Sequence, residues 1–128
     1  LTMFSHIMIG AIDIETSKKF YDATLATLGH APGNIDPKGR CFYVTDTGVF
    51  ALTKPINGES ACHGNGTTVG FAATSEEQAY AWHAAGLENG GVNCEDLPGY
   101  RESPMGPLFL GYLRDPAGNK ICILYRPK

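Results

Sequence analysis

Residues 112–124 read YLRDPAGNKICIL, and this stretch decides which fold the chain can adopt. Two apolar runs flank the segment Asp115-Pro116-Ala117-Gly118. A proline in the second position favours a type I turn, and the glycine that closes the turn tolerates a positive φ. The stretch therefore predicts a β-hairpin with strands at about 107–114 and 119–126.

The chain repeats itself at an offset of 62 residues, and the matches fall on apolar or glycine positions. The pairs are Ile7 with Val69, Ile9 with Phe71, Phe20 with Trp82, Leu25 with Leu87, and Gly29 with Gly91. Further along, residues 43–48 are similar to residues 112–118, with one residue inserted. The sequence therefore indicates two copies of one unit, at about 3–56 and 66–128, joined by a loop rich in glycine.

Both copies predict the same order of elements. In the first, residues 4–12 alternate like a strand, Asp13 can cap the following helix, and Gly29 ends that helix. In the second, Ser75 and Gln78 form a capping box, and a Gly-Gly pair stops the helix. A weak strand and then two clearer strands follow each helix, the clearer pair of the first copy at about 40–46 and 48–54. We therefore expect an α+β fold of two β-α-β-β-β modules.

Length and charge narrow the class of protein. The 128 residues suffice for a single domain, which we expect to span 1–128. The net charge is −3 without a basic run, which argues against nucleic acid as a partner. No apolar stretch of about 18 residues and no signal pattern are present, so we expect a cytoplasmic protein that binds no membrane and naturally starts at Met3. The four cysteines match no zinc-finger spacing, and we expect reduced thiols.

Two segments carry a resemblance to a known family. Residues 4–29, FSHIMIGAIDIETSKKFYDATLATLG, place a strand histidine ahead of a helix, and residues 112–124 are similar to a D-P-x-G-N strand ending. With the repeat, they resemble the vicinal oxygen chelate superfamily, which includes glyoxalase I, bleomycin-resistance proteins and extradiol dioxygenases. The resemblance implies a curled, cup-shaped mixed sheet with helices on its outer face. It also implies that the cup holds a small substrate and a divalent metal.

The resemblance further implies where metal ligands would lie, because the family usually takes a His or Glu from each of four strands. The corresponding positions in this chain are His6, Leu52, Thr68 and Cys122. Strand alternation predicts that all four side chains face the cup. Leucine cannot bind a metal and threonine offers a neutral hydroxyl, so His6 and Cys122 alone would make a weak site. We therefore expect no metal cofactor. If the protein does bind a metal, Cys62 and His63 are the alternative donors.

The remaining residues favour a binding cup with apolar walls and a few polar groups. The predicted ligand-binding residues are Met8, Leu52, Thr68, Arg101, Phe109 and Tyr112. Arg101 lies in a predicted loop over residues 97–107, where its guanidinium could hold a carboxylate or phosphate. If the protein is an enzyme, His6 and Cys122 are the predicted catalytic residues. Both also have structural interpretations, His6 as a hydrogen-bonded strand histidine and Cys122 as a small buried apolar residue.

Three functions are compatible with these residues. The first is binding of a small organic molecule in the cup without the usual metal site, as in bleomycin-resistance-like members. The alternative is a metal-dependent, glyoxalase-like lyase or isomerase, related to lactoylglutathione lyase, with a site rearranged around His6 and Cys122 or His63. The third is an interaction module whose cup is closed by its own side chains. Superfamily members commonly dimerise, so we expect a homodimer.

Overall fold

The chain folds into two modules with the same order of elements. The computed structural model describes residues 3–128, so Leu1 and Thr2, which the predicted domain includes, lie outside the described residues. Module 1 contains β1 (His6–Gly10), α1 (Ile14–Ala26), β2 (Asn34–Ile35), β3 (Cys41–Thr45) and β4 (Gly48–Thr53). Module 2 contains β5 (Val69–Ala72), α2 (Glu76–Glu88), β6 (Val92–Arg101), β7 (Leu108–Arg114) and β8 (Lys120–Tyr125). The predicted β-α-β-β-β order is confirmed in both halves.

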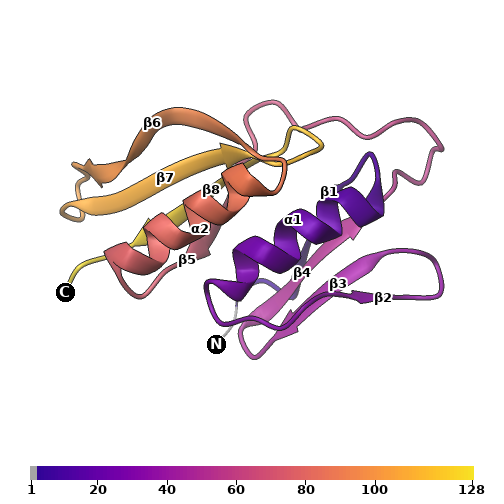
Figure 1. The fold of residues 1–128 in the computed structure, drawn as a ribbon, viewed down its shortest axis with the longest axis horizontal. Helices are drawn as coiled ribbons and strands as arrows, with labels where there is room; N and C mark the ends of the chain where they lie inside the picture. Colours follow the sequence, from indigo (N-terminus) through magenta and orange to yellow (C-terminus); the bar gives the residue numbers. More distant parts are fainter. Residues whose placement is uncertain (1–2) are drawn as a thin grey trace.

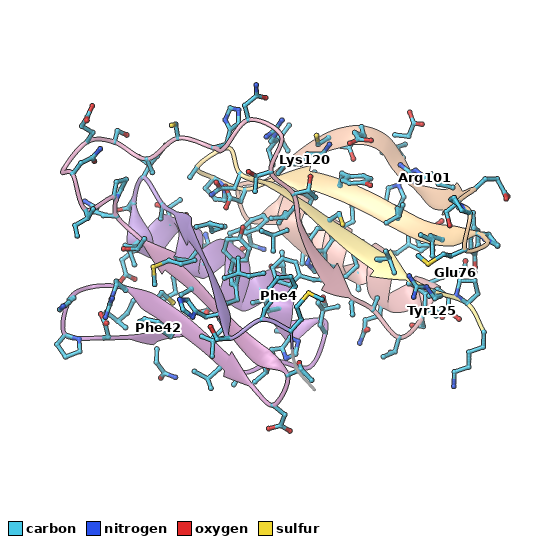
Figure 2. All side chains as sticks on the ribbon, turned by 180° about the vertical axis from the view of Figure 1, so that it is seen from behind. Phe4, Phe42, Glu76, Arg101, Lys120 and Tyr125 are labelled. Atoms are coloured by element: carbon cyan, nitrogen blue, oxygen red, sulfur yellow. The ribbon has the colours of Figure 1, made fainter. Side chains whose placement is uncertain are left out.

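Each module has its own four-stranded mixed sheet. The strand orders are β1-β4-β3-β2 and β5-β8-β7-β6, so β1 and β5 are terminal strands of their sheets. In each module the first strand runs parallel to the last, and the other pairs are antiparallel. Figure 1 shows α1 and α2 side by side on one face, and Figure 2 shows the opposite, open face of both sheets. The expected α+β class, with a cup-shaped sheet and outer helices, is confirmed.

The helices begin and end where the capping residues predict. The Asp13 carboxylate accepts a hydrogen bond from Thr16 N at 2.9 Å and caps α1. The Ser75 hydroxyl accepts from Gln78 N at 3.1 Å and caps α2. Gly29 follows α1 with a φ of +90°, the left-handed conformation that glycine adopts readily. No helix within residues 3–128 is both long and apolar enough to cross a membrane.

The core lies between the helices and the sheets and is continuous across the modules. Its largest buried side chains are Trp82, Tyr21, Phe20, Phe109, Leu52, Leu113, Ile121 and Ile123. The ring of Phe71 on β5 contacts Phe50 on β4, with centroids 5.2 Å apart, and Trp82 on α2, with centroids 6.4 Å apart. Burying a large apolar side chain stabilises a fold by about 1.5–3 kcal/mol. The aromatic cluster therefore joins the modules as well as filling each one.

Asp115, in the turn between β7 and β8, provides a polar link between the modules. Its buried carboxylate accepts hydrogen bonds from Tyr21 Oη on α1 at 2.6 Å and from the backbone nitrogens of Ala117 and Asn119, both at 2.9 Å. The Asn119 amide donates to Gly10 O, at the end of β1, at 2.8 Å. Burial raises the pKa of Tyr21 well above its ordinary value, so the phenol stays a donor. The turn thus holds α1 and β1 against module 2.

The prediction of a loop over residues 97–107 is wrong for residues 97–101. Residues 97–101 belong to β6, which pairs with β7 through a register shift between Cys94 and Gly99. Pro98 lies within this irregular stretch, and Glu95 has a φ of 60°. Proline cannot donate to a strand ladder and is tolerated at a bulge of an edge strand, which is where it lies here.

Candidate functional site

Strand pairing decides which side chains reach the open face of the sheets. His6 pairs with Val49 and Met8 pairs with Ala51, so these four side chains share the open face, as predicted for His6 and Met8. Leu52 pairs with Ile9 on the other face, under α1, and is fully buried. The prediction that Leu52 faces the cup is therefore wrong.

Phe109 also lies on the helix side of its sheet. It pairs with Tyr125 on β8 and is 2% exposed, and its ring packs against Tyr80 of α2 with centroids 5.2 Å apart. The expectation that Phe109 forms a wall of the cup is therefore wrong. The side chain belongs to the core between α2 and the second sheet.

The open face of module 2 carries Tyr112 between two thiols. Tyr112 pairs with Cys94 on one side and with Cys122 on the other, so all three side chains share a face. The Lys120 ammonium lies 5.0 Å and the Arg101 guanidinium 5.8 Å from the Tyr112 ring centroid. Burial raises the pKa of the Cys122 thiol, and the Lys120 charge offsets part of this effect. Cys122 is therefore a poor nucleophile at neutral pH.

Arg101 is held by the backbone around it. Its Nη1 donates to the carbonyl oxygens of Leu97 at 3.2 Å, Gly99 at 3.0 Å and Leu110 at 2.6 Å, and Nη2 donates to Asp96 O at 3.0 Å. These bonds satisfy carbonyl groups in the irregular part of β6. The geometry gives the guanidinium a structural function, and its predicted role as an anion clamp stays a prediction.

The remaining predicted residues are dispersed around the open face. His6 is exposed, and its Nδ1 lies 2.8 Å from Ser5 Oγ. Thr68 is exposed and lies just before β5. Cys62 and His63 lie in the loop between the modules, and a Cβ on Gly118 would lie 3.7 Å from His63 Nδ1. This contact places His63 at the turn between β7 and β8, which meets β1 at Gly10, the end opposite to His6.

A hollow of about 460 Å³ lies where the terminal strands β1 and β5 face each other. We call it the inter-module hollow, because strands β1, β3 and β4 and helix α1 line one side and β5 and α2 line the other. Its apolar walls include Phe4, Leu25, Leu28, Phe50, Val69 and Phe71. Its polar side chains are His6, His30, Thr45, Thr47, Thr74 and Gln78, with the Tyr43 phenol beside them.

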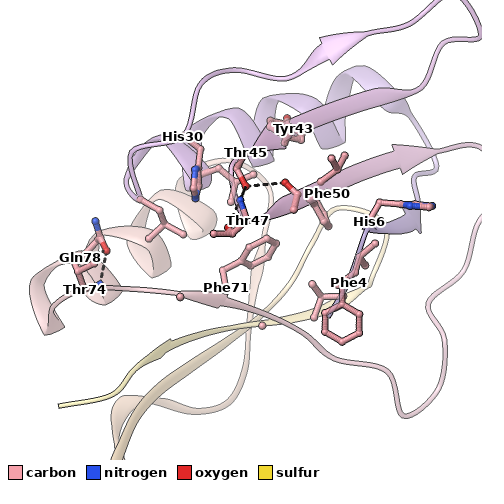
Figure 3. Close-up of a pocket in the computed structure, with 18 residues that line it drawn as sticks. Phe4, His6, His30, Tyr43, Thr45, Thr47, Phe50, Phe71, Thr74 and Gln78 are labelled. Atoms are coloured by element: carbon pink, nitrogen blue, oxygen red, sulfur yellow. Dashed lines mark hydrogen bonds between the residues drawn. The ribbon is translucent and has the colours of Figure 1, made fainter. Parts of the chain in front are cut away.

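Figure 3 shows how the hollow is arranged from end to end. His30, Thr74 and Gln78 lie at one end and Phe50 and Phe71 in the middle, with Thr45 and Thr47 near these rings. Phe4 and His6 lie at the other end, and the His6 imidazole turns away from the two rings. In Figure 2, Phe4 lies between the two halves on the open face. The hollow therefore combines an apolar middle with polar groups at one end.

The hollow reaches the predicted cup residues through Gly70. Gly70 lines the hollow, and a Cβ at this position would lie 3.1 Å from Cys122 Sγ. His6 and Cys122 thus flank β5 from its two sides, His6 on β1 and Cys122 on β8. Within residues 3–128, no group of three or more His, Cys, Asp and Glu side chains is placed to hold a metal ion.

Most of the lining was not identified from the sequence. Phe71 belongs to a strand, and the others belong to a hairpin, a helix end and a cap: Thr45, Thr47, His30 and Gln78. Each has a structural explanation there. The repeat is the sequence signal that bears on the hollow. It predicts two equivalent first strands, and in the fold the free edges of these two strands border the hollow.

Comparisons with known proteins agree with this fold. The family model of the Glyoxalase/Bleomycin resistance protein/Dioxygenase superfamily matches residues 3–123. The chain is similar to the crystal structure of a glyoxalase/bleomycin resistance protein from Albidiferax ferrireducens T118, with 58% identity, 98% of this chain and 100% of that chain covered, and a TM-score of 0.94. No curated protein matches the chain.

Two more distant structures share the fold alone. A glyoxalase-related enzyme from Fulvimarina pelagi is 24% identical, covers 99% of this chain and 90% of its own, and has a TM-score of 0.74. A lactoylglutathione lyase from Agrobacterium tumefaciens is 17% identical, covers 98% of this chain and 94% of its own, and has a TM-score of 0.67.

Proposed function

The chain belongs to the Glyoxalase/Bleomycin resistance protein/Dioxygenase superfamily, and from this premise we propose that it binds a small organic molecule in its sheet cup without a four-ligand metal site. The observation that carries the proposal is the inter-module hollow of about 460 Å³. Small-molecule sites have volumes of this order, with largely apolar walls and a few convergent polar groups. The bound molecule would lie between β1 and β5, reaching from the open face of the cup to the Phe50 and Phe71 rings on the helix side of the sheets.

The donor atoms on the open face support the second part of the proposal. Ala51, which shares the open face with Met8, has no donor atom, and Thr68 offers a neutral hydroxyl. A metal would need the Cys122 thiolate, whose formation burial disfavours. His6 would then be the single good ligand, and one imidazole does not hold a catalytic metal. The residues present do not fit the family's divalent ion, so no reaction step is assigned to it.

Elemental analysis tests the metal part of the proposal. Protein purified without a histidine tag is expected to hold far less than one divalent ion per chain, and added Ni²⁺ or Zn²⁺ is expected to leave the thermal midpoint unchanged. One ion per chain that only a chelator removes would contradict the proposal. It would also favour the alternative, a metal-dependent lyase, and His6→Ala should then abolish metal binding.

A fluorescent probe tests the binding part. N-phenyl-1-naphthylamine is an uncharged aromatic molecule whose emission rises in apolar surroundings, and we expect saturable binding of one molecule per chain. Ala72 lines the hollow and is exposed, so Ala72→Phe should fill the entrance and abolish the signal. Ala84 is exposed on α2 and does not line the hollow, so Ala84→Phe is the matched control. Equal binding by both variants would place the probe elsewhere and contradict the proposal.

Three further expectations belong to this proposal. The catalytic roles predicted for His6 and Cys122 stay predictions, and so do the ligand contacts predicted for Met8, Thr68 and Tyr112 from the open face. The homodimer also stays a prediction, and sedimentation equilibrium at micromolar concentration checks it through the mass of two chains. The mass of a single chain would contradict it.

A further inference from the structure

Within residues 3–128, the lining of the inter-module hollow carries no carboxylate, ammonium or guanidinium group. Among the described residues that line it, none is Asp, Glu, Lys or Arg, and the remaining polar groups are hydroxyls, an amide, two imidazoles and a phenol. Burial and a hydrogen bond to Asp22 raise the pKa of the Tyr43 phenol, so it stays neutral. A charged ligand would lose hydration on entering without gaining an opposite charge, which is costly. The described walls therefore offer an ion of either sign no carboxylate, ammonium or guanidinium partner.

Gln78 gives the hollow a directed hydrogen-bond donor. Its Oε1 accepts from Thr74 N at 2.7 Å, and this bond fixes which end of the amide faces away from the backbone. Because the oxygen is engaged in the cap of α2, the Nε2 group is the end that a ligand can use. The Thr45 hydroxyl, by contrast, donates to Gly48 O at 2.8 Å. The polar end of the hollow therefore offers an N–H donor to a ligand.

We propose that the ligand of the inter-module hollow is an uncharged aromatic compound with a hydrogen-bond acceptor, such as a carbonyl group, at one end. Its rings pack against Phe50 and Phe71, and its acceptor oxygen takes a hydrogen bond from Gln78 Nε2. This inference rests on the proposed small-molecule function and adds the chemical class of the ligand. Ring stacking on phenylalanine supplies affinity, and the hydrogen bond from Gln78 supplies orientation.

Four probes of nearly equal size separate charge from hydrogen bonding. The probes are 2-acetylnaphthalene, 2-ethylnaphthalene, 2-naphthoate and 2-(aminomethyl)naphthalene, each titrated as a competitor against N-phenyl-1-naphthylamine at pH 7.5. The ketone is expected to bind about tenfold more tightly than the carboxylate and the ammonium compound. It should also bind severalfold more tightly than the ethyl compound, because only the ketone accepts a hydrogen bond.

Gln78→Glu is the matching variant. Glutamate keeps an oxygen that can accept from Thr74 N, so the cap of α2 is retained, but the Nε2 donor is replaced by a second carboxylate oxygen. The ketone is expected to bind about tenfold more weakly to this variant, and the ammonium compound more tightly. Binding of the ethyl compound, which uses no hydrogen bond, should change least. A circular dichroism melt checks that α2 is intact.

The outcomes distinguish a failure of the proposed ligand class from a failure of the proposed small-molecule function. If 2-naphthoate or the ammonium compound binds wild type as tightly as the ketone does, the ligand class is wrong, while the hollow remains the binding site. An unchanged affinity of Gln78→Glu for the ketone also overturns the role of Gln78. If N-phenyl-1-naphthylamine itself shows no saturable binding that Ala72→Phe removes, the proposed function fails together with this inference.

Discussion

The two modules share one topology but differ in what they place on the open face and in the turn before the last strand. Module 1 presents Met8 and Ala51 there, whereas module 2 presents Tyr112, Lys120 and Cys122. The β3–β4 hairpin has a two-residue turn, and the β7–β8 hairpin has a five-residue turn that contains Asp115. The helix-side packing fixes the shared fold, and the two copies differ on the open face and in the turns.

The largest expected effect is at Asp115, because the module 2 turn anchors both modules. Asp115→Ala leaves the buried Tyr21 hydroxyl and two backbone N–H groups without their acceptor, and should lower the free energy of unfolding by about 4 kcal/mol. Asp46, in the shorter turn of module 1, is exposed, and Asp46→Ala should cost less than about 0.5 kcal/mol.

Urea unfolding of both Asp115 and Asp46 variants measures this difference. If Asp115→Ala does not fold, Asp115→Asn keeps one acceptor oxygen and should still lose clearly more stability than Asp46→Ala. Equal losses at the two turns would show that the modules are not held together by the module 2 turn.

The second largest effect on stability is expected at Gly86 of α2, which is equivalent to Thr24 of α1, 62 residues earlier. A side chain at Gly86 would collide with Leu113 and lie 3.3 Å from Phe20, so Gly86→Val should cost about 2 kcal/mol. Its counterpart Thr24 is fully buried, and its hydroxyl has no hydrogen-bond partner among the described residues. Thr24→Val keeps the shape and removes that hydroxyl, so stability should be unchanged or rise slightly. Thermal unfolding checks both, and a large loss for Thr24→Val would contradict this interpretation.

A smaller, pH-dependent effect belongs to module 1 alone. Burial by itself would raise the pKa of Asp22, but hydrogen bonds from Gly33 N at 2.9 Å, Lys18 Nζ at 2.7 Å and Tyr43 Oη at 2.8 Å lower it overall. The folded pKa is below the unfolded value of about 4. The stabilisation is therefore complete above that value and is lost as the pH falls through the folded pKa.

Urea unfolding between pH 6 and pH 2.5 checks this expectation. Wild type should lose more stability in that window than Asp22→Asn, whose residue 22 does not titrate. The equivalent position in module 2 is Ala84, so no such contribution arises there. Parallel curves for wild type and variant would contradict a role for Asp22.

The smallest effect concerns thiol reactivity and leaves the fold intact. Cys122 is 8% exposed with a raised pKa, whereas Cys62 in the loop between the modules is exposed. Iodoacetamide at pH 7.5 should alkylate Cys62 at least tenfold faster than Cys122. Mass spectrometry of the labelled peptides measures both rates in one sample. Faster labelling of Cys122 would indicate an activated thiol and revive its predicted catalytic role.

The fold could be predicted because its signals are local and occur twice. The caps at Asp13 and Ser75 and the turn at Asp115 each use short-range hydrogen bonds that the sequence specifies directly. The faces of the strands were harder to predict. The sequence comparison of the two copies aligns Tyr43 with Tyr112 because both are tyrosines. This alignment is one residue out of register, and an error of one residue assigns every side chain of a strand to the opposite face of the sheet. Tyr43 is buried under α1, whereas Tyr112 lies on the open face.

The same shift explains the incorrect part of the predicted site. Strand pairing makes Ala51, rather than Leu52, the counterpart of Cys122, and Leu52 corresponds to Ile123 in the core. The inter-module hollow could not be predicted, because its lining combines α1, a hairpin turn and α2, which meet only after the modules have packed. Side chains that the sequence presents as cap or turn residues therefore also line the hollow once the modules have packed.

The position of β1 and β5 also bears on how this protein behaves at high concentration. A terminal strand is a template on which other chains can add and aggregate. Here β1 and β5 face each other across the hollow. At the outer ends of the sheets, β2 has two residues, and β6 is broken by its register shift and Pro98. The architecture that creates the hollow thus leaves few exposed strand edges on which fibrils could start.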